Sequence, residues 1–175
     1  MQNVRELWNF IEDFPDYEVS NLGRIRNMKT EQILKPTLNQ DGVAIVGLVQ
    51  AFNGGTIQRK RSVAKIVAKE WGVKRLMPTC DTPIRLNGDP MDNRVANLMM
   101  RPRWFAVKYN RQLKEGERYI YPIVTPIRDV ETGRVYEDSL DAAKTHGLLE
   151  EDVVMSIANH TVTWPTYQKF ELIEE

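Results

Sequence analysis

The sequence has little cysteine and little histidine. Among its 175 residues there is one cysteine, Cys80, and there are two histidines, His146 and His160, so residues 1–145 contain none. A single cysteine excludes an internal disulfide and a cysteine zinc site, and we expect its thiol to be exposed or half-buried. Because histidine is the usual general base near neutral pH, residues 1–145 lack the commonest proton acceptor of hydrolases. We expect both histidines to be ordinary side chains rather than ligands.

Long apolar runs are also absent. The longest, "VAIVGLV" at 43–49, is far too short to cross a bilayer, and the first residues, "MQNVRELWNF", lack the features of a signal peptide. We therefore expect a cytoplasmic protein with no membrane partner. A composition of 42% hydrophobic and 27% charged residues is typical of one compact domain with an appendage.

The formal net charge is zero, but the charges are unevenly distributed. Residues 1–119 contain 20 Lys and Arg against 13 Asp and Glu, whereas residues 120–175 contain 4 against 11. The larger part therefore carries +7 and the tail −7. A basic body favours a polyanion such as nucleic acid, and an acidic tail repels one.

Hydrophobic periodicity predicts mixed secondary structure. Short strands are expected in residues 7–36, followed by a hairpin across "FNGGT" and a helix, "SVAKIVAKEW", with Ser62 as its N-cap. Two short strands should flank "LNGDPMDNRVAN", and a helix should begin near Pro102 and end at Gly116. A small hairpin at 127–138 and two short helices separated by Gly147 complete the tail. The predicted class is α+β.

Several of these segments resemble a known family. "LWNFIEDFPDYEVSNLGRIRNM" is similar to the nuclease-associated modular motif of phage and intron-encoded HNH homing endonucleases. "LKPTLNQDGVAIVGLV", "RSVAKIVAKEW" and "IRLNGDPMDNRVANL" follow in that family's order, and the tail is similar to its C-terminal helix-turn-helix motif. The resemblance implies three segments: the modular motif at 1–40, a degenerate ββα-metal (HNH-like) domain at 41–119, and an acidic helix-turn-helix-like module at 120–175.

The resemblance fails at the positions that carry the family's chemistry. Aligned on "NGD" and "DNRV", Arg85 stands at the general-base histidine, and Ile84 and Ala106 stand at metal-ligand positions. Ala64 replaces a further histidine. A guanidinium stays protonated and repels a metal ion, so Arg85 cannot act as a base but suits a phosphate. We therefore predict no catalytic residue, no metal site and no cofactor; Asp81, Asp89 and Asp92 remain a less favoured, improvised metal site.

The basic residues of 59–118 are the candidate contacts to double-stranded DNA, with a solvated helix face as the alternative. We expect Asn93 and Asn97 to brace the hairpin structurally. The candidate DNA contacts are Arg59, Lys60, Arg61, Lys65, Arg85, Arg101, Arg103, Lys108, Arg111 and Lys114.

Three hypotheses about function follow. The first is a catalytically inactive, phage-encoded pseudo-nuclease that binds DNA and regulates transcription or replication. The second is a protein-binding factor for host takeover, which engages a host polymerase or nuclease through its acidic tail, since Glu150, Glu151 and Asp152 would face DNA phosphates. The third is a residual metal-dependent nicking endonuclease with another acid as its base. The sequence favours the first, a protein that is not an enzyme.

Overall fold

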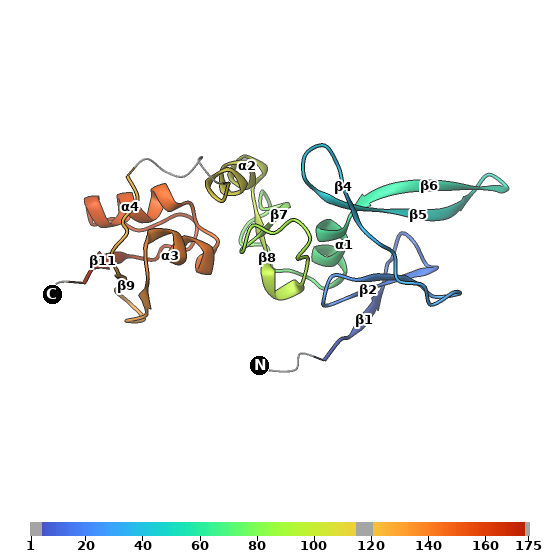
Figure 1. Ribbon diagram of the computed structural model, residues 1–175, viewed down its shortest axis with the longest axis horizontal. Coiled ribbons are helices and arrows are strands. Elements are labelled where there is room, and N and C mark those ends of the chain that lie inside the picture. Colours follow the sequence, from blue (N-terminus) through green and yellow to red (C-terminus); the bar gives the residue numbers. More distant parts are fainter. Residues whose placement is uncertain (1–4, 115–120, 174–175) are drawn as a thin grey trace. The chain divides into compact units, whose positions relative to one another are not determined.

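A computed structural model describes residues 5–114 and 121–173, which form small antiparallel sheets and four α-helices (Figure 1). The predicted α+β class is confirmed. No helix in these residues is long and apolar enough to span a membrane. The strands are β1 (Trp8–Phe10), β2 (Tyr17–Ser20), β3 (Ile25–Asn27), β4 (Thr37–Leu38), β5 (Ala44–Phe52), β6 (Gly55–Ser62), β7 (Thr82–Arg85), β8 (Leu98–Arg101), β9 (Ile127–Asp129), β10 (Val135–Tyr136) and β11 (Phe170–Leu172). The helices are α1 (Val63–Glu70), α2 (Arg103–Gln112), α3 (Ser139–His146) and α4 (Glu150–Asn159), with a short 3-10 helix at Val95–Asn97.

The chain divides into two compact units. The N-terminal unit contains Met1–Arg75 and Asp89–Met100, and the C-terminal unit contains Leu76–Gly88 and Arg101–Glu175. The helix α2 was assigned by sequence to the segment 41–119, but it lies in the C-terminal unit. The expected boundaries at 40 and 119 remain a prediction about sequence motifs and do not coincide with the compact units.

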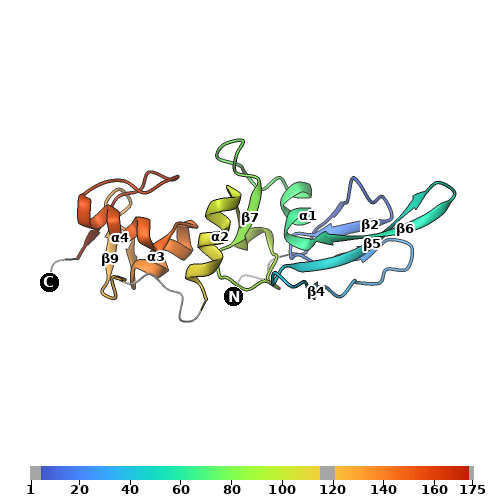
Figure 2. The same cartoon turned by 90° about the horizontal axis from the view of Figure 1, so that it is seen from above.

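In the N-terminal unit, two three-stranded sheets, β1-β2-β3 and β4-β5-β6, share a core with α1. Alternate residues of β5, including Val46 and Leu48, point into this core, as period-two alternation requires. Ser62 caps α1 by accepting a hydrogen bond from the amide of Lys65. Figure 2 shows β5 and β6 continuing as a long two-stranded ribbon.

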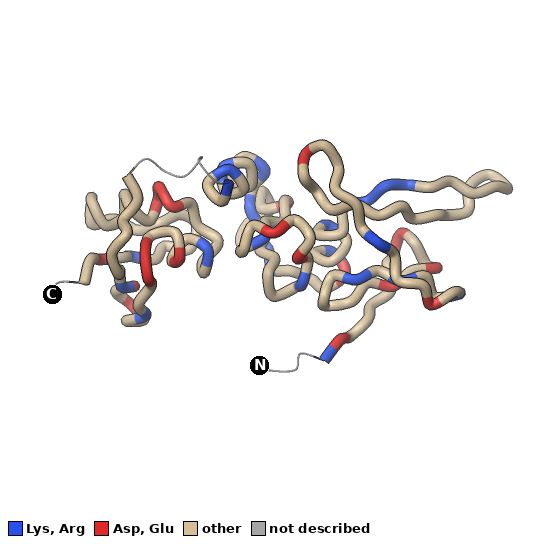
Figure 3. Tube along the Cα trace, viewed as in Figure 1, with Lys and Arg blue, Asp and Glu red and all other residues tan. Residues whose placement is uncertain are grey.

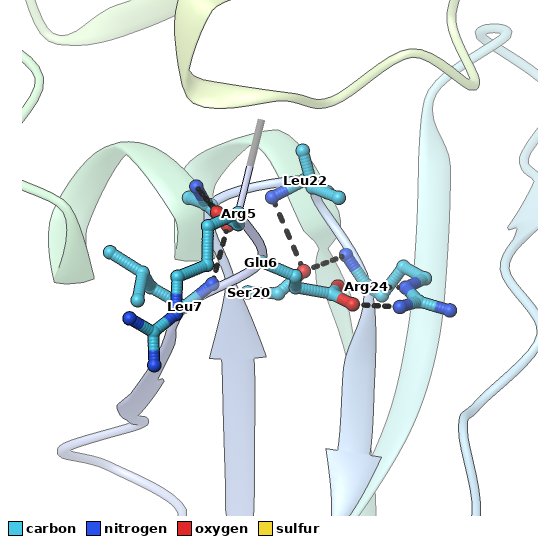
Figure 4. A network of polar contacts seen from close by, with 7 residues as sticks. Arg5, Glu6, Leu7, Ser20, Leu22 and Arg24 are labelled. Atoms are coloured by element: carbon cyan, nitrogen blue, oxygen red, sulfur yellow. Dashed lines mark hydrogen bonds and ion pairs between the residues drawn. The ribbon is translucent and has the colours of Figure 1, made fainter. Parts of the chain in front are cut away.

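A polar network fixes the entry to β1 and the turn between β2 and β3 (Figure 4). The Ser20 hydroxyl accepts from the amides of Leu22 and Arg24 at 3.2 and 3.1 Å. The Arg24 guanidinium binds both carboxylate oxygens of Glu6. Asn21 accepts from the Leu7 amide at 2.9 Å. Three residues of the "SNLGR" segment, Ser20, Asn21 and Arg24, therefore hold the turn through their side chains. The same segment is part of the modular motif that was recognised in the sequence.

The C-terminal unit contains the sheet β10-β9-β11, the helices α3 and α4, and α2 packed against β7. Its apolar core includes Ile127, Tyr136, Leu148 and Phe170. Gly147 ends α3 in the left-handed conformation, at φ 59°, where glycine is unstrained. The two helices fall where the sequence predicted, and a DNA-reading helix-turn-helix role for them remains a prediction.

Arg101 is completely buried within this unit, although it was expected to be exposed to DNA. Its Nε donates to the carbonyl of Gly147 and its Nη2 to the carbonyl of His146, both at 3.0 Å. These carbonyls lie at the carboxyl end of α3, where a helix leaves acceptors unpaired and favours positive charge. Arg101 therefore acts as a buried cap for a helix 45 residues away in the chain.

Gln112, at the other end of α2, binds the same turn. Its amide nitrogen donates to the Leu148 carbonyl at 3.0 Å, and its amide oxygen accepts from the Glu150 amide at 2.8 Å. Arg101 and Gln112 together hold the α3–α4 turn; we call this set of contacts the turn clasp. Cys80 is also fully buried here, which corrects the expectation of an exposed or half-buried thiol.

Replacing Arg101 with alanine should destabilise the protein. The change leaves buried carbonyls unpaired, and each such group costs about 1–3 kcal/mol. Because two carbonyls lose their partner, chemical denaturation should show a loss of roughly 2–6 kcal/mol. The adjacent exposed Arg103→Ala is the matched control and should change stability by about 0.5 kcal/mol or less. Equal losses in the two variants would show that the buried contacts of Arg101 carry no special stability.

Candidate functional site

The positions that resemble the HNH catalytic site are occupied by buried side chains. Ile84 in β7 is fully buried, Arg85 is 7% exposed, and Ala106 is buried on α2, which packs against β7. Ala64 is buried in the core of the N-terminal unit. Isoleucine and alanine offer no oxygen or nitrogen ligand, and a guanidinium repels a cation, so Ile84, Arg85 and Ala106 do not fit a divalent metal ion. A phosphate contact by the buried Arg85 remains a prediction.

The acids near this hairpin take part in local turn contacts. Asp89 accepts from the Met91 amide at 2.8 Å, and Asp92 forms a two-point ion pair with Arg94 at 2.8 and 2.6 Å. Asp81 accepts from the Thr82 hydroxyl at 2.9 Å. Across 5–114 and 121–173, no group of three His, Cys, Asp or Glu side chains is arranged to hold a metal ion. These contacts are ordinary turn chemistry, as the residue types suggest.

Asn93 and Asn97 hold the loop before β8 through its own backbone. The Asn93 amide donates to the carbonyls of Pro90 and Met91 at 3.2 and 3.1 Å, and the Asn97 amide donates to the Asp92 carbonyl at 2.8 Å. Gly23 lies against this loop, since a Cβ there would lie 2.7 Å from the Asn93 carbonyl carbon. The modular motif and the loop therefore pack within one unit.

One histidine lies in a partly buried polar network of the C-terminal unit. His146 Nε2 is 2.6 Å from the Tyr136 hydroxyl, and its Nδ1 is 3.0 Å from the side-chain amide nitrogen of Gln168, which also binds Asp129 at 3.0 Å. Burial lowers the pKa of His146, and Asp129 and Arg134 act on it in opposite directions. His146 is half-buried in the structure. Sequence reasoning missed this network because Gln168 gave no signal. His160, exposed, ends α4.

The candidate DNA contacts of the N-terminal unit lie in a stretch without acids. Residues 42–69 contain no Asp or Glu, and Figure 3 shows basic residues on β6. Lys60, Arg61 and Lys65 are exposed, and Arg59 is half-buried. Arg61 lies over the Phe14 ring at 5.6 Å. This stretch presents positive charge over β6 and the start of α1.

The remaining candidates belong to the C-terminal unit, where 101–114 also contains no acid. Arg103, Lys108, Arg111 and Lys114 are exposed. Arg101 is buried in the turn clasp, so its assignment to DNA contact is corrected.

The acids at the start of α4 face α2 and the core of their own unit. Glu150 is buried, and its carboxylate accepts from the Ser139 hydroxyl at 2.7 Å. Glu151 binds Lys108 at 2.6 Å and raises the pKa of that lysine. Sequence reasoning treated both acids as exposed to a partner, and the structure instead uses them within the unit.

Comparison with known proteins gives two matches. A family model, the NUMOD4 motif, which is nuclease-associated, matches residues 6–49, where the resemblance to a modular motif was recognised. No curated protein matches the chain. A solved structure described as "DNA binding and cleavage by the HNH homing endonuclease I-HmuI" matches with a TM-score of 0.50 and 19% identity. The match covers 97% of this chain and 99% of the other.

The fold is similar to that of an HNH homing endonuclease. The family model matches residues 6–49 alone and the structural match shows the fold, while the degenerate catalytic site remains a sequence-based interpretation. The expectation of a protein that is not an enzyme is corrected by these findings. The matching structure is that of a DNA-cleaving enzyme, and the matching motif is nuclease-associated, so both point toward an endonuclease.

The His146 network predicts that stability depends on pH. Protonated histidine has no acceptor for the Gln168 amide, and burial lowers the folded-state pKa below the ordinary value of about 6.5. The stabilisation should be complete above that value and be lost as pH falls through the folded-state pKa. Denaturation between pH 8 and about pH 5 should show this loss in the wild type and a weaker pH dependence in His146→Gln. His160→Asn is the control and should keep the pH dependence of the wild type. If His146→Gln also kept that pH dependence, its assignment to His146 would be refuted.

Proposed function

We propose that the protein is a DNA endonuclease of the HNH homing type, which binds double-stranded DNA and cleaves at least one strand. The observation that carries this proposal is a fold match that extends over 97% of the chain to an enzyme described as binding and cleaving DNA. The NUMOD4 motif at residues 6–49 supports it independently. Regulation of transcription or replication has no support beyond the sequence.

Two stretches of the sequence that contain cations and no acids support DNA as the substrate. Each compact unit carries such a stretch, residues 42–69 in the N-terminal unit and 101–114 in the C-terminal unit. Exposed cations bind phosphates and release counterions, which gives affinity without sequence preference. Two of the acids at the start of α4 are engaged within the C-terminal unit, since Glu150 is buried and Glu151 pairs with Lys108.

The proton acceptor in this proposal is a carboxylate. Residues 1–145 contain no histidine, and His146 is held by Tyr136 and Gln168. Asp89 is exposed in the loop between β7 and β8, and it is the first candidate for the base. A carboxylate is a weaker base than the imidazole of histidine, so turnover should be slow.

The exposed lysines of the N-terminal unit should contribute to DNA affinity. Lys60→Gln and Lys65→Gln should each reduce the slope of log affinity against log salt concentration by about 0.9, the value expected for one lost phosphate contact. Fluorescence titration of a labelled duplex between 50 and 200 mM salt measures this slope. Lys29→Gln is the control, because Lys29 is paired with Asp16 and lies outside the candidate surface. Slopes that are the same in all variants would exclude Lys60 and Lys65 from the interface.

Cleavage is tested on supercoiled plasmid at enzyme excess with Mg²⁺ or Mn²⁺. We expect slow conversion to the nicked form. Asp89→Asn should abolish nicking and keep DNA binding, whereas the exposed Asp41→Asn should leave both unchanged. Binding without any nicking by the wild type would refute the enzymatic part of the proposal. Nicking that survives Asp89→Asn would refute only the assignment of the base.

A further inference from the structure

Trp104 is exposed on α2, which is unusual for the largest aromatic side chain. The residue is 56% exposed, while its neighbour Phe105 is fully buried. One turn along the same face of the helix, Val107 is 63% exposed. The inward face of α2 carries Phe105 and Tyr109, so the helix buries one aromatic face and exposes a second. Core packing of α2 therefore explains Phe105 but not the position of Trp104.

Trp164 supports the exposed ring from the protein side. The rings of Trp104 and Trp164 are stacked, with centroids 5.5 Å apart and planes at 28°. Trp164 in turn lies 5.6 Å from the buried Phe105 ring. The three rings thus form a continuous series from the core of the C-terminal unit to its surface. Stacking on Trp164 restricts the rotation of the Trp104 side chain before any partner binds, which lowers the entropic cost of binding.

The surroundings of Trp104 are positively charged. Arg103, Lys108 and Arg111 are exposed on the same helix, and no acid occurs in residues 101–114. Lys108 is paired with Glu151, so the positive charge around Trp104 comes mainly from the two arginines. An exposed indole among cations suits a partner that combines flat aromatic groups with negative charge. Nucleic acid has both properties, because every base offers a π-face and every nucleotide a phosphate.

An intact duplex hides the faces of its bases by stacking them on one another. A flat ring on a protein surface can therefore stack only on a base that has left the helical stack, as in a single strand, a bulge or a distorted duplex. We propose that Trp104, backed by Trp164, is a stacking platform for one unstacked nucleobase of bound DNA. This inference rests on the proposed DNA-binding function and adds a contact that recognises distorted or single-stranded DNA.

The test uses three fluorescent duplexes of the same sequence: fully paired, with one bulged thymidine, and with the same bulge carrying an abasic nucleotide. Wild-type protein should bind the thymidine bulge more tightly than the abasic bulge. Trp104→Leu, which keeps apolar volume but removes the π-face, should weaken binding to the thymidine bulge by roughly 5- to 150-fold, the range for loss of one base stack. Trp104→Phe should retain most of the affinity.

The abasic probe separates stacking from a structural role. Trp104→Leu should have little effect on the affinity for the abasic bulge or the paired duplex. The loss of affinity should therefore require both the tryptophan and the bulged base, as expected for two groups in contact. The control is Val135→Ala, an exposed apolar residue on β10, which should affect no probe. Equal weakening on the thymidine and abasic bulges would overturn the platform and leave DNA binding intact. Failure of the wild type to bind any probe would overturn the proposed function as well.

Discussion

The arrangement of the C-terminal unit depends on the pairing of buried carbonyl groups at the end of α3. A helix end leaves its last carbonyls without partners, and burying them unpaired is costly. The Arg101 guanidinium satisfies the carbonyls of His146 and Gly147, and Gln112 satisfies Leu148 and the amide of Glu150. Arg101 ends β8 just before α2, and Gln112 is the last residue of α2. Because the two side chains act at opposite ends of the helix, the turn clasp fixes which face of that helix is buried. Burial lowers the pKa of Arg101, but its ordinary value lies so high that the side chain stays charged.

The exposed face of α2 follows from this constraint. With Phe105, Ala106 and Tyr109 turned inward, Trp104 and the cations are left on the surface. From the sequence, the acids of the tail seemed to oppose DNA binding. Within the same unit, however, Glu150 accepts a hydrogen bond from Ser139 and Glu151 forms an ion pair with Lys108. The formal charge of a segment therefore says less about its partner than the pairing of its individual groups. The proposed DNA contacts of this unit are the cations that lie exposed on α2.

The sequence predicted the elements well because their signals are local. Ser62, Gly147 and the "FNGGT" turn mark boundaries through their own backbone preferences. The assignment of Ile84, Arg85 and Ala106 to catalytic positions stays a sequence-based prediction, and the structure shows that all three are buried. The role of Arg101 could not be predicted, because its acceptors lie 45 and 46 residues further along the chain and no local pattern announces them. The prediction that the protein is not an enzyme was wrong. It inferred the function of the whole fold from the absence of one histidine.

The turn clasp makes α2 part of the C-terminal unit, and the surface proposed to meet DNA depends on this. Native-state hydrogen exchange, followed residue by residue, tests it most directly. If the clasp holds, the amides inside α2 and those of α3 and α4 should exchange through one shared opening, with the same free energy and the same dependence on denaturant. Exchange of α2 at a much lower free energy than α3 and α4 would contradict the account, because the helix would then open independently of the unit that positions it.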